Sequence, residues 1–318
     1  MKAKIAIALV LATIGCKQRS GAGTILASST AQAAPSGVPG LNDLITASNQ
    51  SVAQGATDTR FVPTPLIRQS QNFTCGVVAL QSVLMFWGNE IREGQLAVTL
   101  QTTAADGTSY LQMVKLLDRL TDPSTFDKNW AAVKAVLSPA EAQEAAGLVD
   151  TTPSTKQKKK KLLQAVNGAY TYTLRPGTEH VDADGNTLSD SDQTQIPKDG
   201  MSVQDLEAAI QRGHPTIVLI QGWLDTPTTD VKKLSTDYID GHFVVAIGYD
   251  QTNFYFMDPS TTGNYTFIPR DEFVVRWHDS DDDISRMGQI PKNWMRHFGL
   301  EIWKDQPSFA LDAITKIL

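Results

Sequence analysis

The chain has 318 residues, of which 41% are hydrophobic and 19% are charged, as in an ordinary soluble protein. This length allows one large domain or two small ones, with a sizeable core in either case. The formal net charge of -6 gives no indication of nucleic-acid binding, and no stretch beyond the N-terminus is long and apolar enough to predict a membrane span.

Residues 1–15 have the pattern of an export signal, in which lysines precede an apolar run. Two cleavage sites compete. One precedes Cys16, where the sequence resembles a bacterial lipobox and the cysteine would be lipidated, although Thr13 stands where leucine is usual. The other follows the small-x-small triplet at 31–33, which lies some way past the apolar run. We therefore expect an exported protein, and favour a cell-envelope lipoprotein anchored at Cys16 over a soluble periplasmic or secreted form.

A flexible tether is predicted for residues 16–60, which are rich in glycine, alanine, serine, threonine and glutamine. Within it, residues 41–45 predict only a short helical turn. The prolines in 61–67 favour an extended chain, and the folded part begins there. We expect the folded domain to span 61–318, with an insertion at about 121–200.

Helical patterns come first in the folded part and strand patterns come second. Residues 76–87 are apolar except for Gln81 and Ser82, which predicts a buried helix. Further ranges typical of helices are 93–100, 109–120, 130–137, 139–149 and 202–210, and strand patterns cover 170–174, 215–223, 242–249, 253–257, 273–277 and 299–303. This order favours an α+β fold with an antiparallel sheet.

A cysteine stands at the predicted start of the buried helix. Thr74 is expected to cap that helix, and Cys75 would lie in its first turn, where the helix dipole favours the nucleophilic thiolate. The sequence has 2 cysteines, and lipidation or signal cleavage would remove Cys16 from disulfide chemistry. We therefore expect a reactive, unpaired Cys75. The alternatives are a buried structural cysteine, or a Cys16–Cys75 disulfide in a chain that keeps its signal.

One of the 5 histidines has the context of a catalytic base. His242 begins a buried strand directly after Gly241, and Gly241 would let another backbone or a substrate chain come close. Asp258 ends the next strand, and the tight turn at 250–253 puts His242 and Asp258 at the same end of the hairpin. A carboxylate there can orient an imidazole. The alternatives are an ordinary histidine of the core or surface and an ordinary Asp-Pro turn.

A thiol nucleophile also needs donors for the oxyanion of its tetrahedral intermediate. The backbone N–H of Cys75 is one candidate, and the side chains of Gln69 and Gln71 on the preceding loop are two others. No metal or cofactor is expected: residues 182–186 suggest a calcium loop but fail its template, and the basic run 156–161 is typical of a solvated face.

Taken together, these motifs resemble a known family. Gln69 six residues before Cys75, an apolar helix, the run that begins at His242 and then Asp258-Pro look like the papain-like peptidases of bacteriocin exporters, which cut leader peptides after a double glycine. They resemble more closely the stand-alone peptidase-like domains of exported bacterial proteins. The resemblance covers about residues 61–304.

The resemblance implies an α+β, papain-like fold, in which a helical half bearing the cysteine packs on an antiparallel sheet half bearing the histidine and aspartate. It implies that Cys75 is the nucleophile, His242 the general base and acid, and Asp258 the group that orients the histidine. It also chooses Gln69 over Gln71 as the oxyanion donor.

Three departures limit the transfer of function: no transporter segments follow, residues 121–200 form an extra insertion, and the signal places the protein outside the cytoplasm. We expect an exported cysteine peptidase that hydrolyses a peptide or protein substrate without a cofactor. It would bind no nucleic acid and contact a membrane only through a lipid at Cys16. The alternatives are an amide acyl-transferase on the same scaffold and a catalytically silent binding module.

Overall fold

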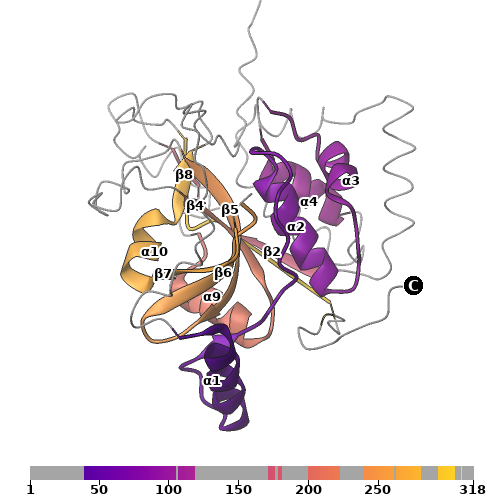
Figure 1. Ribbon diagram of the computed structural model, residues 1–318. Coiled ribbons are helices and arrows are strands. Elements are labelled where there is room, and N and C mark those ends of the chain that lie inside the picture. The colour runs from indigo at the N-terminus through magenta and orange to yellow at the C-terminus, as the bar shows by residue number, and fades with distance from the viewer. Residues whose placement is uncertain are drawn as a thin grey trace, which may run out of the picture.

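The computed structural model describes residues 39–104, 107–118, 171–175, 178–180, 200–222, 240–260, 263–280, 293–304 and 309. Helices α2, α3 and α4 lie together on one side of a twisted sheet, and α10 lies on the other side (Figure 1). None of the described helices is long and apolar enough to cross a membrane.

The large sheet is antiparallel and has 7 strands in the described residues. Its order is β2 (Thr171–Arg175), β10 (Gly299–Trp303), β4 (Thr216–Gln221), β5 (Gly241–Tyr249), β6 (Asn253–Met257) and β7 (Tyr265–Pro269), with β1 (Arg60–Phe61) paired to β5. Every residue of β4, β5 and β6 is buried, because helices cover both faces of the sheet centre. A smaller sheet joins β3 (Thr178–His180), β9 (Asn293–Arg296) and β8 (His278–Ser280).

The helices are α1 (Leu41–Ala53), α2 (Cys75–Phe86), α3 (Glu93–Thr99), α4 (Tyr110–Asp118), α9 (Val203–Gln211) and α10 (Arg270–Arg276). The prediction of a buried helix after Cys75 is confirmed, since all residues of α2 except Met85 are buried. Ser202 caps α9, because its Oγ accepts a hydrogen bond from Asp205 N at 3.0 Å. Helices followed by a largely antiparallel sheet make the α+β class that the order of patterns predicted.

Two predicted elements differ from the structure. Residues 41–53 of the predicted tether form the helix α1, whose Leu44 is buried. Residues 273–277, predicted as a strand, lie in and just after the helix α10. There, Phe273, Arg276 and Trp277 are buried while Val274 is 40% exposed, which is the spacing of one helical face rather than the alternation of a strand.

The predicted insertion at 121–200 contains a strand of the main sheet. Residues 171–175 form β2, which pairs with β10 along its whole length, so this part belongs to the main sheet. The remaining expectations for residues 119–170 and 181–199 lie outside the described residues, as do the export signal, both cleavage sites and Cys16.

Candidate active site

Cys75 is the first residue of α2 and lies against the start of strand β5. Its side chain is fully buried, and its Sγ accepts a hydrogen bond from the backbone N–H of Phe243 at 3.5 Å. The close approach depends on Gly76, because a Cβ at that position would lie 2.8 Å from Thr108 Cβ and 2.9 Å from Phe243 Cδ2. The start of α2 therefore packs closely against β5 at Phe243, the residue that follows His242.

The sulfur of Cys75 takes part in a disulfide in this structure. The unpaired thiol expected for an exported chain is therefore not the form described here. The other cysteine of the sequence, Cys16, lies outside the described residues. Nucleophilic chemistry at Cys75 requires the thiolate, so it requires that this disulfide be reduced first.

Thr74 occupies the position before α2, but its side chain does not cap the helix. Its hydroxyl instead lies 2.6 Å from Glu93 Oε1 and 3.0 Å from the carbonyl oxygen of Gln71. Glu93 also accepts the backbone N–H of Ser70, at 3.0 and 3.1 Å from its two oxygens. The predicted cap is wrong because a charged carboxylate competes for the hydroxyl, and Glu93 fixes both ends of the loop before Cys75.

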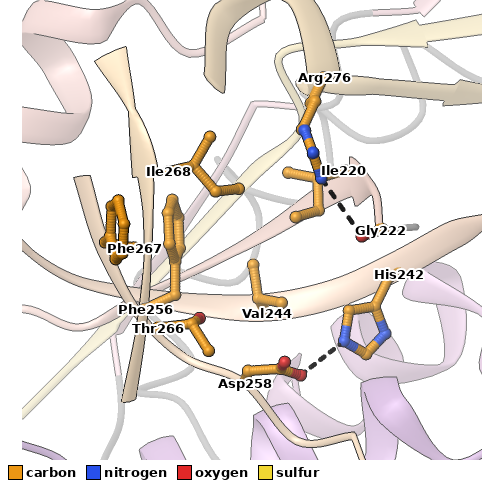
Figure 2. A pocket seen from close by; sticks show the side chains of 10 residues that line it. All are labelled: Ile220, Gly222, His242, Val244, Phe256, Asp258, Thr266, Phe267, Ile268 and Arg276. Carbon is orange, nitrogen blue, oxygen red and sulfur yellow. Dashed lines mark hydrogen bonds and ion pairs between the residues drawn. The ribbon is translucent and has the colours of Figure 1, made fainter. Parts of the chain in front are cut away.

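His242 and Asp258 meet at the end of the β5–β6 hairpin, where the sequence predicted them. His242 Nε2 lies 2.8 Å from Asp258 Oδ1. The strands pair in the register Val245 to Met257, and a bulge between Ala246 and Gly248 shifts the pairing by one residue nearer the turn. The local hairpin geometry thus brings the imidazole and the carboxylate together, as Figure 2 shows.

The environment of Asp258 favours its ionised form. Burial alone would raise the pKa of Asp258, but the hydrogen bond and charge of His242 and the N–H of Ser260, 2.9 Å from Oδ1, together lower it below the usual value. The carboxylate therefore holds Nε2 of His242, and Nδ1 is the ring nitrogen that can exchange a proton with a thiol.

Gln69 lies next to the segment that carries Asp258. Its backbone N–H donates to the carbonyl oxygen of Pro259 at 2.7 Å, and its side chain is buried. Its Nε2 donates to the carbonyl oxygen of Gln71 at 2.7 Å, while its Oε1 is buried without a hydrogen-bond partner. Gln71 is exposed, so of the two candidate glutamines only Gln69 is built into the site.

A buried polar group that the sequence did not reveal supports the start of β5. Gln221 Nε2 donates to Asp279 Oδ1 at 3.1 Å, and Gln221 Oε1 accepts the N–H of Asp240 at 3.2 Å. A Cβ on Gly241 would lie 2.0 Å from Asp279 Oδ2. The space beside Gly241 is therefore filled by the side chain of Asp279, whereas we expected another backbone or a substrate chain there. The sequence feature that could have indicated this buried group is Gln221, a glutamine at the end of the largely apolar strand β4.

Other histidines with described contacts have structural surroundings. His214 Nδ1 lies 2.6 Å from Glu301 and stacks on Trp303, and His297 stacks on Trp277. Among the described residues, no group of histidine, cysteine, aspartate and glutamate has the arrangement of a metal site. The geometry that remains is a cysteine at a helix start, whose sulfur contacts the backbone of the residue that follows His242, and a carboxylate that holds the imidazole of His242. These are residue types used for acyl transfer through sulfur.

Among solved structures, the chain is similar to one from Bacillus anthracis described as a candidate C39-like peptidase, with 15% identity over 78% of this chain and 98% of that chain and a TM-score of 0.37. No curated protein matches. The model of the peptidase C39-like family matches residues 62–283, which include Gln69, Cys75, His242 and Asp258. The chain therefore belongs to the peptidase C39-like family and has the α+β, papain-like fold that its motifs indicated.

Proposed function

We propose that this protein is an exported cysteine peptidase that hydrolyses peptide bonds through Cys75, His242 and Asp258. The observation that carries the proposal is the meeting of the start of α2 with the start of β5: Cys75 Sγ contacts the N–H of Phe243, and the adjacent His242 is held by Asp258 at 2.8 Å. Family membership supports the same reaction class. The export signal and the lipid anchor at Cys16 belong to the proposal and rest on the sequence alone. Because the sequence has 2 cysteines, the lipid-anchored form would carry Cys75 as a thiol, without an intrachain disulfide partner.

The reaction begins with Cys75 as a thiol, and a chain that carries the Cys75 disulfide reaches this state only after a thiol reductant has reduced it. Nδ1 of His242 takes the proton of Cys75, and Sγ attacks the carbonyl carbon of the substrate. The oxyanion that forms is held by the backbone N–H of Cys75 and, after its amide group rotates away from Gln71, by the side chain of Gln69.

The C–N bond then breaks, and His242 gives its proton to the departing amine. This leaves a thioester on Cys75. Water attacks the thioester carbon and gives a proton to His242, the C–S bond breaks, and His242 returns the proton to sulfur. Asp258 stays ionised throughout and stabilises the imidazolium that forms twice in the cycle.

The test uses the full chain, with and without a thiol reductant, on a mixture of unstructured peptides whose cleavage is followed by mass spectrometry. We expect cleavage only with reductant, and a loss of about 10⁴-fold or more in the Cys75→Ala variant. The matched control is Cys16→Ser, which removes the other thiol of the sequence and is expected to stay active.

Three other results would contradict the proposal. Equal cleavage by the Cys75→Ala variant would mean that a contaminant does the cutting. Cleavage of no peptide, with unchanged binding of a partner by the Cys75→Ala variant, would favour the binding module. Transfer of the acyl group to an added amine in preference to water would favour the acyl-transferase.

A further inference from the structure

The imidazole of His242 has a second neighbour besides Asp258, namely the backbone of Gly222, one residue past the end of β4. A Cβ at Gly222 would lie 2.8, 3.2 and 3.4 Å from Cβ, Cγ and Cδ2 of His242, which are the three atoms nearest to it. The φ angle of Gly222 is not in the left-handed region, so the backbone conformation alone does not require glycine here. The side chain of His242 is therefore what leaves no room for a Cβ at this position.

The backbone of Gly222 is held from two sides. Its N–H donates to the carbonyl oxygen of Asp240 at 2.8 Å, which continues the pairing of β4 with β5. Its carbonyl oxygen accepts a hydrogen bond from Nη1 of Arg276 at 3.2 Å, drawn as a dashed line in Figure 2. The same Nη1 lies 3.4 Å from the carbonyl oxygen of Gln221. Arg276 therefore fixes the end of β4 at the residue that packs against the imidazole.

Arg276 is itself fixed within α10. Its Nη2 lies 2.5 Å from Oε1 of Glu272, one helical turn earlier, and the residue is only 7% exposed. Phe273 and Trp277 beside it are fully buried, so this part of the chain is packed firmly into the core. Taking a guanidinium out of water costs free energy that its ion pair does not always return, so such a pair is weak evidence for stability. A geometric role accounts better for a buried arginine at this place.

We propose that Arg276 is a positioning residue for the base His242. Through the carbonyl oxygen of Gly222 it keeps the backbone of that residue against the imidazole, and this contact excludes other side-chain rotamers of His242. Nε2 is then kept at Asp258, and Nδ1 is the nitrogen that can take the proton of Cys75. Arg276 touches no reacting atom and transfers no proton. This proposal rests on the proposed function, because it assigns a further residue to the same site.

The first measurement needs no catalysis. The full chain with Cys75→Ala is isotopically labelled in its histidine nitrogens, and the ring-nitrogen NMR signals of His242, assigned with a His242→Gln chain, report its tautomer at alkaline pH. Because Nε2 donates to Asp258, we expect one protonated and one unprotonated nitrogen with widely separated signals. In Gly222→Ala the added methyl group displaces the ring, so the two signals should move toward each other as the tautomers mix. Gly94→Ala, where a Cβ would meet nothing within 4 Å, should leave them unchanged.

The second measurement compares kinetics with stability. The double change Arg276→Met with Glu272→Gln removes the guanidinium without leaving the carboxylate of Glu272 unpaired. It should lower kcat on a cleaved peptide by about tenfold with KM unchanged, because a small misplacement of a reacting group already slows the reaction. The midpoint of denaturant unfolding should not fall. Arg276→Lys keeps a charged donor for Glu272 and Gly222 and should recover most of kcat.

The matched control is the other arginine of α10. Arg270 also donates from Nη1 to a backbone carbonyl oxygen, that of Asp250 at 2.8 Å, and its Nη2 pairs with Glu207. Asp250 directly follows β5, at the end of the strand opposite His242. Arg270→Met with Glu207→Gln should therefore keep both kcat and the imidazole signals.

Unchanged signals of His242 in both Gly222→Ala and the double variant of Arg276 and Glu272 would overturn the proposal, whether or not any peptide is cut. A fall in kcat that only matches a loss of folded protein would also overturn it. Converging signals in a chain that cuts no peptide would support the positioning of His242 and count against the peptidase alone. The two proposals therefore fail separately.

Discussion

At the scale of the residue, Asp258 contacts the imidazole ring of His242, whereas the sulfur of Cys75 contacts the backbone of the next residue of the strand. Asp258 Oδ1 lies 2.8 Å from Nε2 of His242 and also accepts the N–H of Ser260 at 2.9 Å. The carboxylate is thus fixed by its own backbone and in turn fixes the ring. The sulfur of Cys75 lies against the next residue of the strand, Phe243, and not against the carboxylate. In the proposed mechanism, proton transfer would therefore run between sulfur and imidazole, and the carboxylate would act by orientation and charge.

Replacing Asp258 separates these two effects. Asp258→Asn keeps a hydrogen-bonding oxygen but removes the charge, so it should lower kcat by about 10²-fold or more with little change in KM. Asp258→Ala removes both and should lower kcat further. Steady-state kinetics on a cleaved peptide measures the difference. Equal activity of wild type and Asp258→Ala would exclude an orienting role.

The lowered pKa of Asp258 also makes a prediction about stability. A carboxyl group whose pKa is lower in the folded state stabilises the fold above its unfolded pKa, about 3.9, and that contribution is lost as the pH falls through the folded pKa. Denaturant unfolding of wild type and Asp258→Asn should therefore differ by a constant free energy above about pH 5, and the difference should shrink below about pH 4. A difference that instead grew on acidification would contradict the ion pair.

At the scale of the element, the position of Cys75 depends on how closely α2 approaches β5. Gly76 is the contact point, because a side chain there would collide with Met113 Cε, Thr108 Cβ and Phe243 Cδ2 at 2.6 to 2.9 Å. The loop before the helix is held from another direction by Glu93 at the start of α3. Cys75 is thus positioned by strand β5 and by the start of helix α3.

Gly76→Ala should destabilise the protein by about 1–3 kcal/mol, because an added methyl group overpacks the contact between α2 and β5. The matched control is Gly94→Ala in α3, where a Cβ would meet nothing within 4 Å. That change should stabilise the protein by up to about 1 kcal/mol through better helix propensity. Denaturant unfolding measures both, and a neutral Gly76→Ala would mean that the helix start has room to move.

Glu93 is predicted to act as a positioning residue for the loop that carries Gln69 and Thr74. Glu93→Ala removes the acceptor for Ser70 N and Thr74 Oγ1 and should lower kcat by about tenfold, while Glu93→Gln, which keeps an acceptor, should recover most of it. The control is Asp43→Asn, which changes an exposed first-turn acid in the distant helix α1. If Glu93→Ala lowers only stability and leaves kcat of the folded protein unchanged, Glu93 has a purely structural role.

The sequence predicts the local parts of this site better than the distant ones. The meeting of His242 and Asp258 was predictable because a short turn fixes the hairpin register. The approach of Asp279 to Gly241 was not, because it joins segments that no local pattern connects. A strand was predicted at 273–277 because β-branched and aromatic residues favour strands. The prediction was wrong, because a helix is the structure that buries Phe273 and Trp277 on one face.

At the scale of the whole molecule, residues 61–69 connect the two halves. Val62 N donates to Ile247 O at 2.6 Å on β5, and Gln69 N donates to Pro259 O at 2.7 Å after β6. Between them, the Tyr265 hydroxyl of β7 donates to the carbonyl oxygen of Thr64 at 2.5 Å. This segment contacts β5, the residue after β6, and β7, and it leads directly into the loop before Cys75, so its anchoring affects the position of Cys75 relative to His242.

Tyr265→Phe removes one of these anchors and should destabilise the protein by about 1 kcal/mol. Burial raises the pKa of Tyr265 from 10.0 to about 12, so the folded state keeps the phenol protonated where the unfolded chain ionises. The contribution of this group is therefore fully present below pH 10 and is lost as the pH rises toward about 12. Unfolding measured across this range should show wild type losing stability more steeply than Tyr265→Phe. Parallel pH profiles for the two proteins would mean that the hydroxyl is not buried against Thr64, and that the segment is anchored to the sheet by its backbone alone.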